Sequence, residues 1–228
     1  MTTCLVVGGS HGIGRMIAQR RADAGEEVVV TSRDQFRADE TATAIGGRTR
    51  GLALDLAKPG GIEESLNGMQ LLDHLVITAI EQGVNTLADF DVDAAARVVT
   101  LKLVGYTETI RVLRPRFRSG ASVVLFGGVA KDRPYPGSTM VTAFNGGVTA
   151  LVKTLAIELA PYRVNAIHPG VVGDSPKWRD VPDHPHIART PIQRLVTMEE
   201  VADATDFLLS NSGMNGHNLV IDGGLTAT

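Results

Sequence analysis

The sequence predicts an α/β protein with a single domain, in which a doubly wound, seven-stranded parallel sheet carries helices on both faces. Short runs of Val, Leu and Ile alternate along the chain with amphipathic segments of helical length. The 228 residues, 43% of them hydrophobic, are enough for one core of ordinary size. We therefore expect residues 1–228 to form one domain.

Continuous apolar runs bounded by turn-forming residues predict the strands, because a strand covered on both faces needs no alternation. They are expected at residues 3–8, 27–31, 50–54, 72–78, 122–126, 163–168 and 218–222. Apolar residues at helical spacing predict helices at residues 12–24, 35–45, 61–68, 91–114, 139–159 and 199–210. Pro115 sets the end of the fourth helix, since the residue before a proline rarely continues a helix. Residues 172–192 contain four prolines and are expected to form a lid loop over the active site.

A glycine-rich turn joins the first strand to the first helix. Gly8, Gly12 and Gly14 are spaced G-x3-G-x-G, which allows a sharp turn and leaves no Cβ where a pyrophosphate approaches the helix N-terminus. The exposed N–H groups and the helix dipole favour a dianion there. In this context the turn predicts the dinucleotide site of a Rossmann fold. The residues expected to line it are Gly8, Ser10, His11, Gly12, Ile13 and Gly14.

Charge and cysteine content exclude several classes of partner. The net charge of −3 offers no basic field for nucleic acid and no polybasic segment for a membrane surface. Cys4, the only cysteine, lies in the first strand and is expected to be a buried, inert thiol in a reducing compartment. Neither a leader nor an apolar stretch of about 18 residues is evident. We expect a cytoplasmic protein with no nucleic-acid or membrane partner.

Further motifs follow in order along the chain. They are Leu-Asp-Leu at 54–56, Asp-His-Leu-Val at 73–76, Leu-Ala-Ile-Glu-Leu at 155–159, Arg-Val-Asn at 163–165, Pro-Gly at 169–170 and Asp-Gly-Gly at 222–224. Together with the glycine turn, they make the whole chain resemble the short-chain dehydrogenase/reductase family. The resemblance implies an oxidoreductase acting on a small molecule, assembled as a homodimer or homotetramer. It adds these cofactor-binding residues: Asp55, Leu56, Thr78, Ala79, Pro169, Gly170 and Ser175.

The end of the second strand predicts which nicotinamide cofactor is bound. An acidic side chain there would bind the ribose hydroxyls of NAD and repel a 2′-phosphate, but the chain has Ser32 and Arg33 instead. We therefore expect NADP(H). In the alternative interpretation, Ser32 and Arg33 only begin a solvated helix. Asp55 likewise either accepts from the adenine amino group or caps the following turn.

The residues that carry catalysis in the family are replaced in this chain. The tyrosine position is Val141, and the lysine position four residues later is Asn145. The serine position falls on Gly128 or Gly127, and the asparagine position is Lys102. The lysine and the asparagine have thus exchanged places. The fourth strand also ends at Ile80, where the family has a glycine beside the cofactor ribose.

Lys102 is the residue best able to replace the missing chemistry, because an ammonium can stabilise a developing oxyanion or supply its proton. In the alternative interpretation it is a surface lysine at a subunit boundary. Tyr106, on the same helical face, is either a phenol partner or a core or interface aromatic. Tyr135 borders the pocket of the family and is the second candidate phenol. The predicted catalytic residues are Lys102, Tyr135 and Asn145.

The lid and the preceding loop contain weaker candidates. Trp178 either covers an apolar substrate or anchors the lid. His184 and His186 lack further ligands at metal-binding spacing, so no metal site is expected. The charged residues 131–133 either contact an anionic substrate or form a solvated turn.

Three functions remain open from the sequence. The favoured one is an NADP(H)-dependent oxidoreductase that acts on a small carbonyl or alcohol through an atypical site centred on Lys102. The second is an NADP(H)-binding sensor or scaffold without turnover. The third is an isomerase or lyase on the same fold, in which Lys102 moves a proton or forms a Schiff base.

Overall fold

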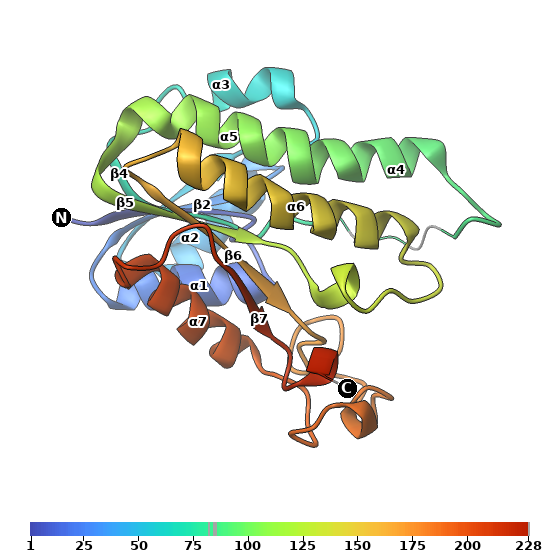
Figure 1. The fold of residues 1–228 in the computed structure, drawn as a ribbon. Helices are drawn as coiled ribbons and strands as arrows, with labels where there is room; N and C mark the ends of the chain where they lie inside the picture. The colour runs from blue at the N-terminus through green and yellow to red at the C-terminus, as the bar shows by residue number, and fades with distance from the viewer. Residues whose placement is uncertain (82, 84–85, 228) are drawn as a thin grey trace.

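The computed structural model describes residues 1–81, 83 and 86–227, and it contains a seven-stranded parallel sheet in the order β3-β2-β1-β4-β5-β6-β7 (Figure 1). This arrangement confirms the expected fold class. The order reverses between β1 and β4, which is the point where ligands bind in doubly wound sheets. The strands are β1 (Thr3–Val7), β2 (Glu27–Ser32), β3 (Arg48–Ala53), β4 (Leu72–Ile77), β5 (Phe117–Phe126), β6 (Arg163–Pro169) and β7 (Asn218–Ile221).

Helices cover both faces of the sheet (Figure 1). They are α1 (Gly12–Asp23), α2 (Gln35–Ile45), α3 (Ile62–Ser65), α4 (Val92–Val99), α5 (Tyr106–Leu113), α6 (Thr139–Glu158) and α7 (Met198–Ser210). The side chains of β1 alternate between two hydrophobic clusters: Leu5 and Val7 pack with α5 and α6, whereas Cys4 and Val6 pack with α1 and α7. Every residue of β1 is therefore buried, which explains why its sequence is continuously apolar.

Three elements differ from the sequence predictions. β5 begins at Phe117 rather than at residue 122, immediately after a short 3₁₀ turn that contains Pro115. The third helix is limited to Ile62–Ser65, preceded by a 3₁₀ turn at Pro59–Gly61. The long fourth helix is α4 and α5 joined by a π-helical turn at Thr100–Gly105, which contains Lys102. π-Helical turns inside α-helices are frequent at functional sites.

One helix in the described part of the chain, α6, is long and apolar enough to cross a membrane by length and composition alone. The expectation that no stretch approaches such a span was therefore wrong. Val148 and Val152 of α6 are fully buried against the sheet in the same cluster as Leu5. α6 thus packs one face against the sheet.

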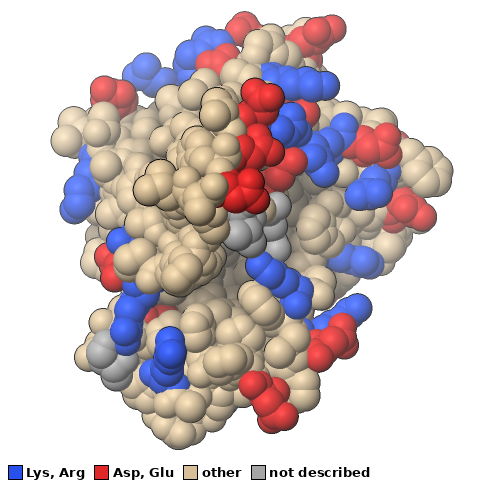
Figure 2. Space-filling view, turned by 90° about the vertical axis from the view of Figure 1, so that its right-hand side faces the viewer, with Lys and Arg blue, Asp and Glu red and all other residues tan. Residues whose placement is uncertain are grey.

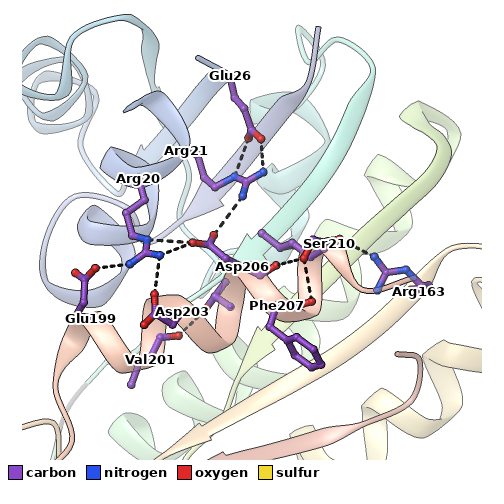
Figure 3. A network of polar contacts seen from close by, with 12 residues as sticks. Arg20, Arg21, Glu26, Arg163, Glu199, Val201, Asp203, Asp206, Phe207 and Ser210 are labelled. Carbon is purple, nitrogen blue, oxygen red and sulfur yellow. Dashed lines mark hydrogen bonds and ion pairs between the residues drawn. The ribbon is translucent and has the colours of Figure 1, made fainter. Parts of the chain in front are cut away.

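An ion-pair network joins α1 to α7 on one face of the sheet (Figure 3). Arg20 lies between Glu199, Asp203 and Asp206 of α7. Arg21 pairs with Asp206 at 3.2 Å and also with Glu26. Asp206 therefore bridges two arginines, one of which has a side chain only 15% exposed.

We expect Asp206→Ala to lower the free energy of unfolding by about 1–3 kcal/mol, because it leaves the largely buried Arg21 with one partner fewer. Glu199→Ala, which removes a carboxylate that is 62% exposed, is the matched control and should cost about 0.5 kcal/mol or less. Urea denaturation measures both changes. Equal losses in the two variants would show that Asp206 contributes no more than a surface ion pair.

Candidate active site

The glycine turn adopts a backbone that only glycine accommodates easily. Gly8 and Gly12 have positive φ angles of 84° and 55°. A Cβ on Gly14 would lie 2.4 Å from the carbonyl oxygen of Gly8, so the helix packs directly on the turn. A Cβ on Gly12 would lie in van der Waals contact with Pro176 of the predicted lid, at 3.6 Å. Pro176 therefore packs over the turn at Gly12.

Hydroxyl groups connect the turn to the neighbouring strand ends. The Gly8 N–H donates to Thr31 Oγ1 at 3.2 Å. Thr78 Oγ1 lies 3.1 Å from the Val7 oxygen and 3.2 Å from the Gly8 oxygen, to which it donates. The carboxyl ends of β1, β2 and β4 are thus held together around the turn. Thr78, an expected cofactor residue, has a structural role in the turn as well.

The predicted adenosine end of the site carries charges of both signs. Arg33 Nη1 lies 3.7 Å from Glu81 Oε1, and Glu81 Oε2 accepts from Arg97 Nε at 2.7 Å. Asp55 Oδ1 accepts from the Ala57 N–H at 3.0 Å, which is the turn-capping role left open by the sequence. Figure 2 looks onto the edge of the sheet where the strands end and shows acidic and basic side chains close together beside a central hollow.

Lys102 is fully buried, with 1% of its surface exposed. Its ammonium donates to the Phe126 carbonyl oxygen at 2.7 Å and to the Tyr106 hydroxyl at 2.8 Å. The Tyr106 hydroxyl donates in turn to the Ala79 carbonyl oxygen at 2.8 Å. The lysine and tyrosine thus form a buried pair between the carboxyl ends of β4 and β5. Burial excludes the alternative of a surface lysine for Lys102. Tyr106 is both its hydrogen-bond partner and a residue of the hydrophobic core.

Burial changes the proton affinity of both groups. It lowers the pKa of Lys102 from 10.5 to about 7, because the charged form loses its hydration. It raises the pKa of Tyr106 well above its ordinary value of 10. Near neutral pH the amine of Lys102 can therefore exist in either protonation state, whereas the phenol of Tyr106 keeps its proton. Such a lysine suits proton transfer.

Asn145 lies on α6 opposite the end of β5. A Cβ on Gly128 would approach Asn145 Nδ2 to 3.0 Å, so the two residues are in close contact. The buried Oδ1 of Asn145 has no hydrogen-bond partner among the described residues. The amide therefore has a free acceptor at the site, which fits a donor group of a bound molecule.

His168 is a site residue that the sequence analysis missed. It is fully buried, and its Nδ1 accepts from the Gly128 N–H at 3.2 Å while Nε2 contacts Asn218 Oδ1 at 2.9 Å. A Cβ on Gly127 would lie 2.4 Å from its Nδ1. Burial, the largest effect, lowers the pKa of His168, which keeps the ring neutral. Its place directly before the Pro-Gly motif was the signal that could have identified it.

The predicted lid, residues 172–192, and the loop after β5 contain the remaining candidates. Tyr135 is half exposed, and in the described part of the chain no hydrogen bond joins its phenol to Lys102 or Asn145. Ser175 Oγ donates to the Val172 carbonyl oxygen at 2.7 Å rather than pointing freely into the site. Trp178 packs edge-on against His184, at 4.6 Å between ring centroids. It also lines a lid cavity of about 260 Å³.

Several further side chains have local roles. His184 contacts His186, and no third ligand joins them within the described residues. Lys131 pairs with Asp132, and Arg133 donates to the Leu225 carbonyl oxygen at 2.8 Å. Among the residues expected to bind the cofactor, the side chain of Ser10 contacts that of His11 at 3.2 Å, Leu56 is buried, and Gly170 packs against Asp222. Ile80, beside the predicted ribose site, is half exposed.

A glycine turn at the switch point of a doubly wound sheet is the feature by which folds of this class bind dinucleotides. The chain belongs to the short-chain dehydrogenase/reductase family. Residues 7–226 match the family model described as enoyl-(acyl carrier protein) reductase.

Curated relatives and solved structures agree with this assignment. The chain is 28% identical over 232 residues to 3-oxoacyl-[acyl-carrier-protein] reductase from Mus musculus, covering 99% of this chain and 98% of the relative. It is 31% identical to carbonyl reductase family member 4 from Xenopus laevis, with 97% of each covered. A short-chain dehydrogenase/reductase family protein superposes with a TM-score of 0.90 at 28% identity, covering 100% of this chain and 98% of that one. 3-Ketoacyl-(acyl-carrier-protein) reductase from Brucella melitensis, complexed with NADH, gives 0.87 at 28% identity, with 99% and 98% covered.

We expect Gly14→Ala to destabilise the protein by more than about 2 kcal/mol, since its Cβ must displace the Gly8 carbonyl. Gly146→Ala is the matched control, because Gly146 is also helical and a Cβ there meets nothing within 4 Å. It should be neutral or stabilising by up to about 1 kcal/mol. Urea denaturation tests both, and two similar losses would contradict the close packing of the turn.

The lowered pKa of Lys102 predicts a pH-dependent stability. Between about pH 7 and 10.5 the unfolded chain binds a proton that the folded chain does not, so the wild type gains stability as pH rises. The slope approaches about 1.4 kcal/mol per pH unit in that window. Lys102→Met should lack this gain. Denaturation curves at pH 7 to 9.5 measure this difference, and Lys153→Met, at an exposed lysine, is the control. If the stability of wild type and of Lys102→Met depended on pH in the same way, the prediction would be contradicted.

Proposed function

We propose that this oxidoreductase uses NADP(H) to interconvert a small carbonyl compound and its alcohol, with Lys102 as the proton donor and acceptor. One observation carries the proposal: the buried Lys102–Tyr106 pair lies at the carboxyl ends of β4 and β5, and Thr78 at the end of β4 is bonded to the glycine turn. The replacement of the tyrosine and lysine of the family by Val141 and Asn145 leaves Lys102 as the buried titratable amine of this site.

The residues at the turn fit a dinucleotide. His11, at the N-cap of α1, makes no side-chain cap, so the N–H groups of the helix N-terminus can bind a phosphate. The free Oδ1 of Asn145 is available to a donor such as a ribose hydroxyl or the carboxamide of a nicotinamide. Ser32 and Arg33, with no acidic residue at the end of β2, support the choice of NADP(H). When bound, the reduced cofactor supplies the hydride that adds to the carbonyl carbon.

The protein then has to neutralise the charge on the carbonyl oxygen. Two of the three N–H groups of the Lys102 ammonium donate to Phe126 and Tyr106, which leaves one donor for the substrate oxygen or for a water leading to it. Transfer of this proton gives the alcohol and a neutral amine. Tyr106, whose hydroxyl proton is donated to Ala79, holds the amine in position.

Assembly and location are also proposed. Relatives in this family pair their long helices across subunits, and Val104 and Ile157 are exposed apolar residues on the corresponding helices here. We therefore propose that the protein is a homodimer or homotetramer. We also propose that it is located in the cytoplasm and has no nucleic-acid or membrane partner.

We expect Lys102→Met to lower kcat for carbonyl reduction by about 10²- to 10⁴-fold, the usual contribution of a positioned proton donor. Affinity for NADPH should change far less, because the amine of Lys102 is hydrogen-bonded to Phe126 and Tyr106 and is not part of the predicted adenosine end of the site. The wild-type reduction rate should fall as pH rises above about 7, where the ammonium loses its proton, and the oxidation rate should rise. NADPH oxidation across a panel of carbonyl compounds measures these effects.

Lys153→Met controls for the loss of a lysine elsewhere on the surface. An active Lys102→Met variant with an unchanged pH profile would contradict the role of Lys102. A wild type that binds NADPH and reduces nothing in the panel would favour a binding protein without turnover.

A further inference from the structure

Four charged side chains of alternating sign form a row at the predicted adenosine end of the site. Arg33 follows β2, Asp55 follows β3, Glu81 follows β4, and Arg97 is on α4. Arg97 Nη2 lies 3.8 Å from Asp55 Oδ2, and Arg97 Nε lies 2.7 Å from Glu81 Oε2. Arg33 Nη1 is 3.7 Å from the other oxygen of Glu81. Glu81 is thus shared by two arginines.

The two contacts of Glu81 differ in strength. The bond to Arg97 has the distance of a charge-assisted hydrogen bond, whereas the contact to Arg33 is long, and the Arg33 side chain is 63% exposed. An exposed ion pair of this kind contributes little free energy. Arg33 can therefore exchange Glu81 for a phosphate dianion, which offers more charge and more acceptors than a carboxylate.

The position of Glu81 has a cost for such a phosphate. A carboxylate within 4 Å of Arg33 lies beside any anion that Arg33 binds, and the like charges repel each other. Arg97 limits this repulsion because it neutralises Glu81 from the other side. Removing Glu81 would free Arg33 and leave Arg97 paired with Asp55 alone, whereas removing Arg97 would leave Glu81 paired with Arg33 alone.

We propose that Glu81 is an internal counter-ion of Arg33 and Arg97 that competes with the 2′-phosphate of the cofactor, and that Glu81 and Arg97 together set the preference between phosphorylated and unphosphorylated dinucleotides. This inference rests on the proposed binding of NADP(H) beside Arg33. It assigns opposite effects to two residues in direct contact, which a purely structural ion pair does not produce.

The test is the dissociation constant of NADPH and of NADH for the full chain, measured by the fluorescence of the bound reduced nicotinamide. Glu81→Gln is expected to tighten NADPH by about 3- to 10-fold and to change NADH by less than about 2-fold. Arg97→Gln is expected to weaken NADPH by a similar factor. Titration with 2′,5′-ADP and 5′-AMP repeats the comparison without a nicotinamide and without turnover.

Glu63→Gln is the matched control, since Glu63 is an exposed carboxylate that pairs with Arg111 at 2.7 Å in another part of the surface. It should leave both dissociation constants unchanged. Thermal unfolding of each variant without nucleotide separates an effect on binding from an effect on folding.

The outcomes separate this inference from the proposed function. A Glu81→Gln variant with an unchanged ratio of NADPH to NADH affinity, or with weaker NADPH binding, overturns the role of Glu81 alone. If the wild type prefers NADH and the Glu81→Gln variant shifts the ratio of affinities toward NADPH, the assignment of NADP(H) is overturned and the role of Glu81 is supported. A wild type that binds neither nucleotide overturns both.

Discussion

Burial of the Lys102 amine is the constraint to which the neighbouring elements of the site conform. A charged amine without water must be satisfied by other dipoles, and here these are the Phe126 carbonyl and the Tyr106 hydroxyl. The π-helical turn between α4 and α5 contains the lysine. The end of β5 supplies its carbonyl acceptor, and Ala79 after β4 accepts the hydrogen bond of Tyr106. The resulting cost of ionisation gives the amine a pKa of about 7, so the same packing that buries it makes it suitable for proton transfer.

Two glycines at the end of β5 leave room for side chains from neighbouring elements. Asn145 fills the space next to Gly128, and a side chain on Gly128 would press on the amide. His168 similarly occupies the position that a side chain on Gly127 would need, and it binds the Gly128 N–H. A side chain could not be added at this strand end unless these neighbours moved. The two glycines and the side chains of Asn145 and His168 therefore pack as one unit.

The sequence predicted most of the fold because local patterns determine it. Apolar runs located all seven strands, and the glycine spacing located the turn. The early start of β5 and the π-helical turn could not be predicted, since neither has a distinct local pattern. In the site, the bond between Lys102 and Tyr106 agrees with their spacing of four residues, which places both on one face of a helix. The Pro-Gly motif marks the position of His168, but the contacts of His168 and of Glu81 join different segments of the chain and could not be predicted from local spacing.

One segment of backbone contacts both ends of the site. Ala79 accepts the hydrogen bond of Tyr106, and two residues later Glu81 pairs with Arg33 and Arg97. A change at either residue can therefore displace the other through the short stretch that joins them. Effects of variants at the two ends need not add, because residues that share a structural unit often show coupling energies of about 0.5–3 kcal/mol. A double-mutant cycle between Glu81 and Lys102 separates direct effects on nucleotide and proton from effects carried by this segment.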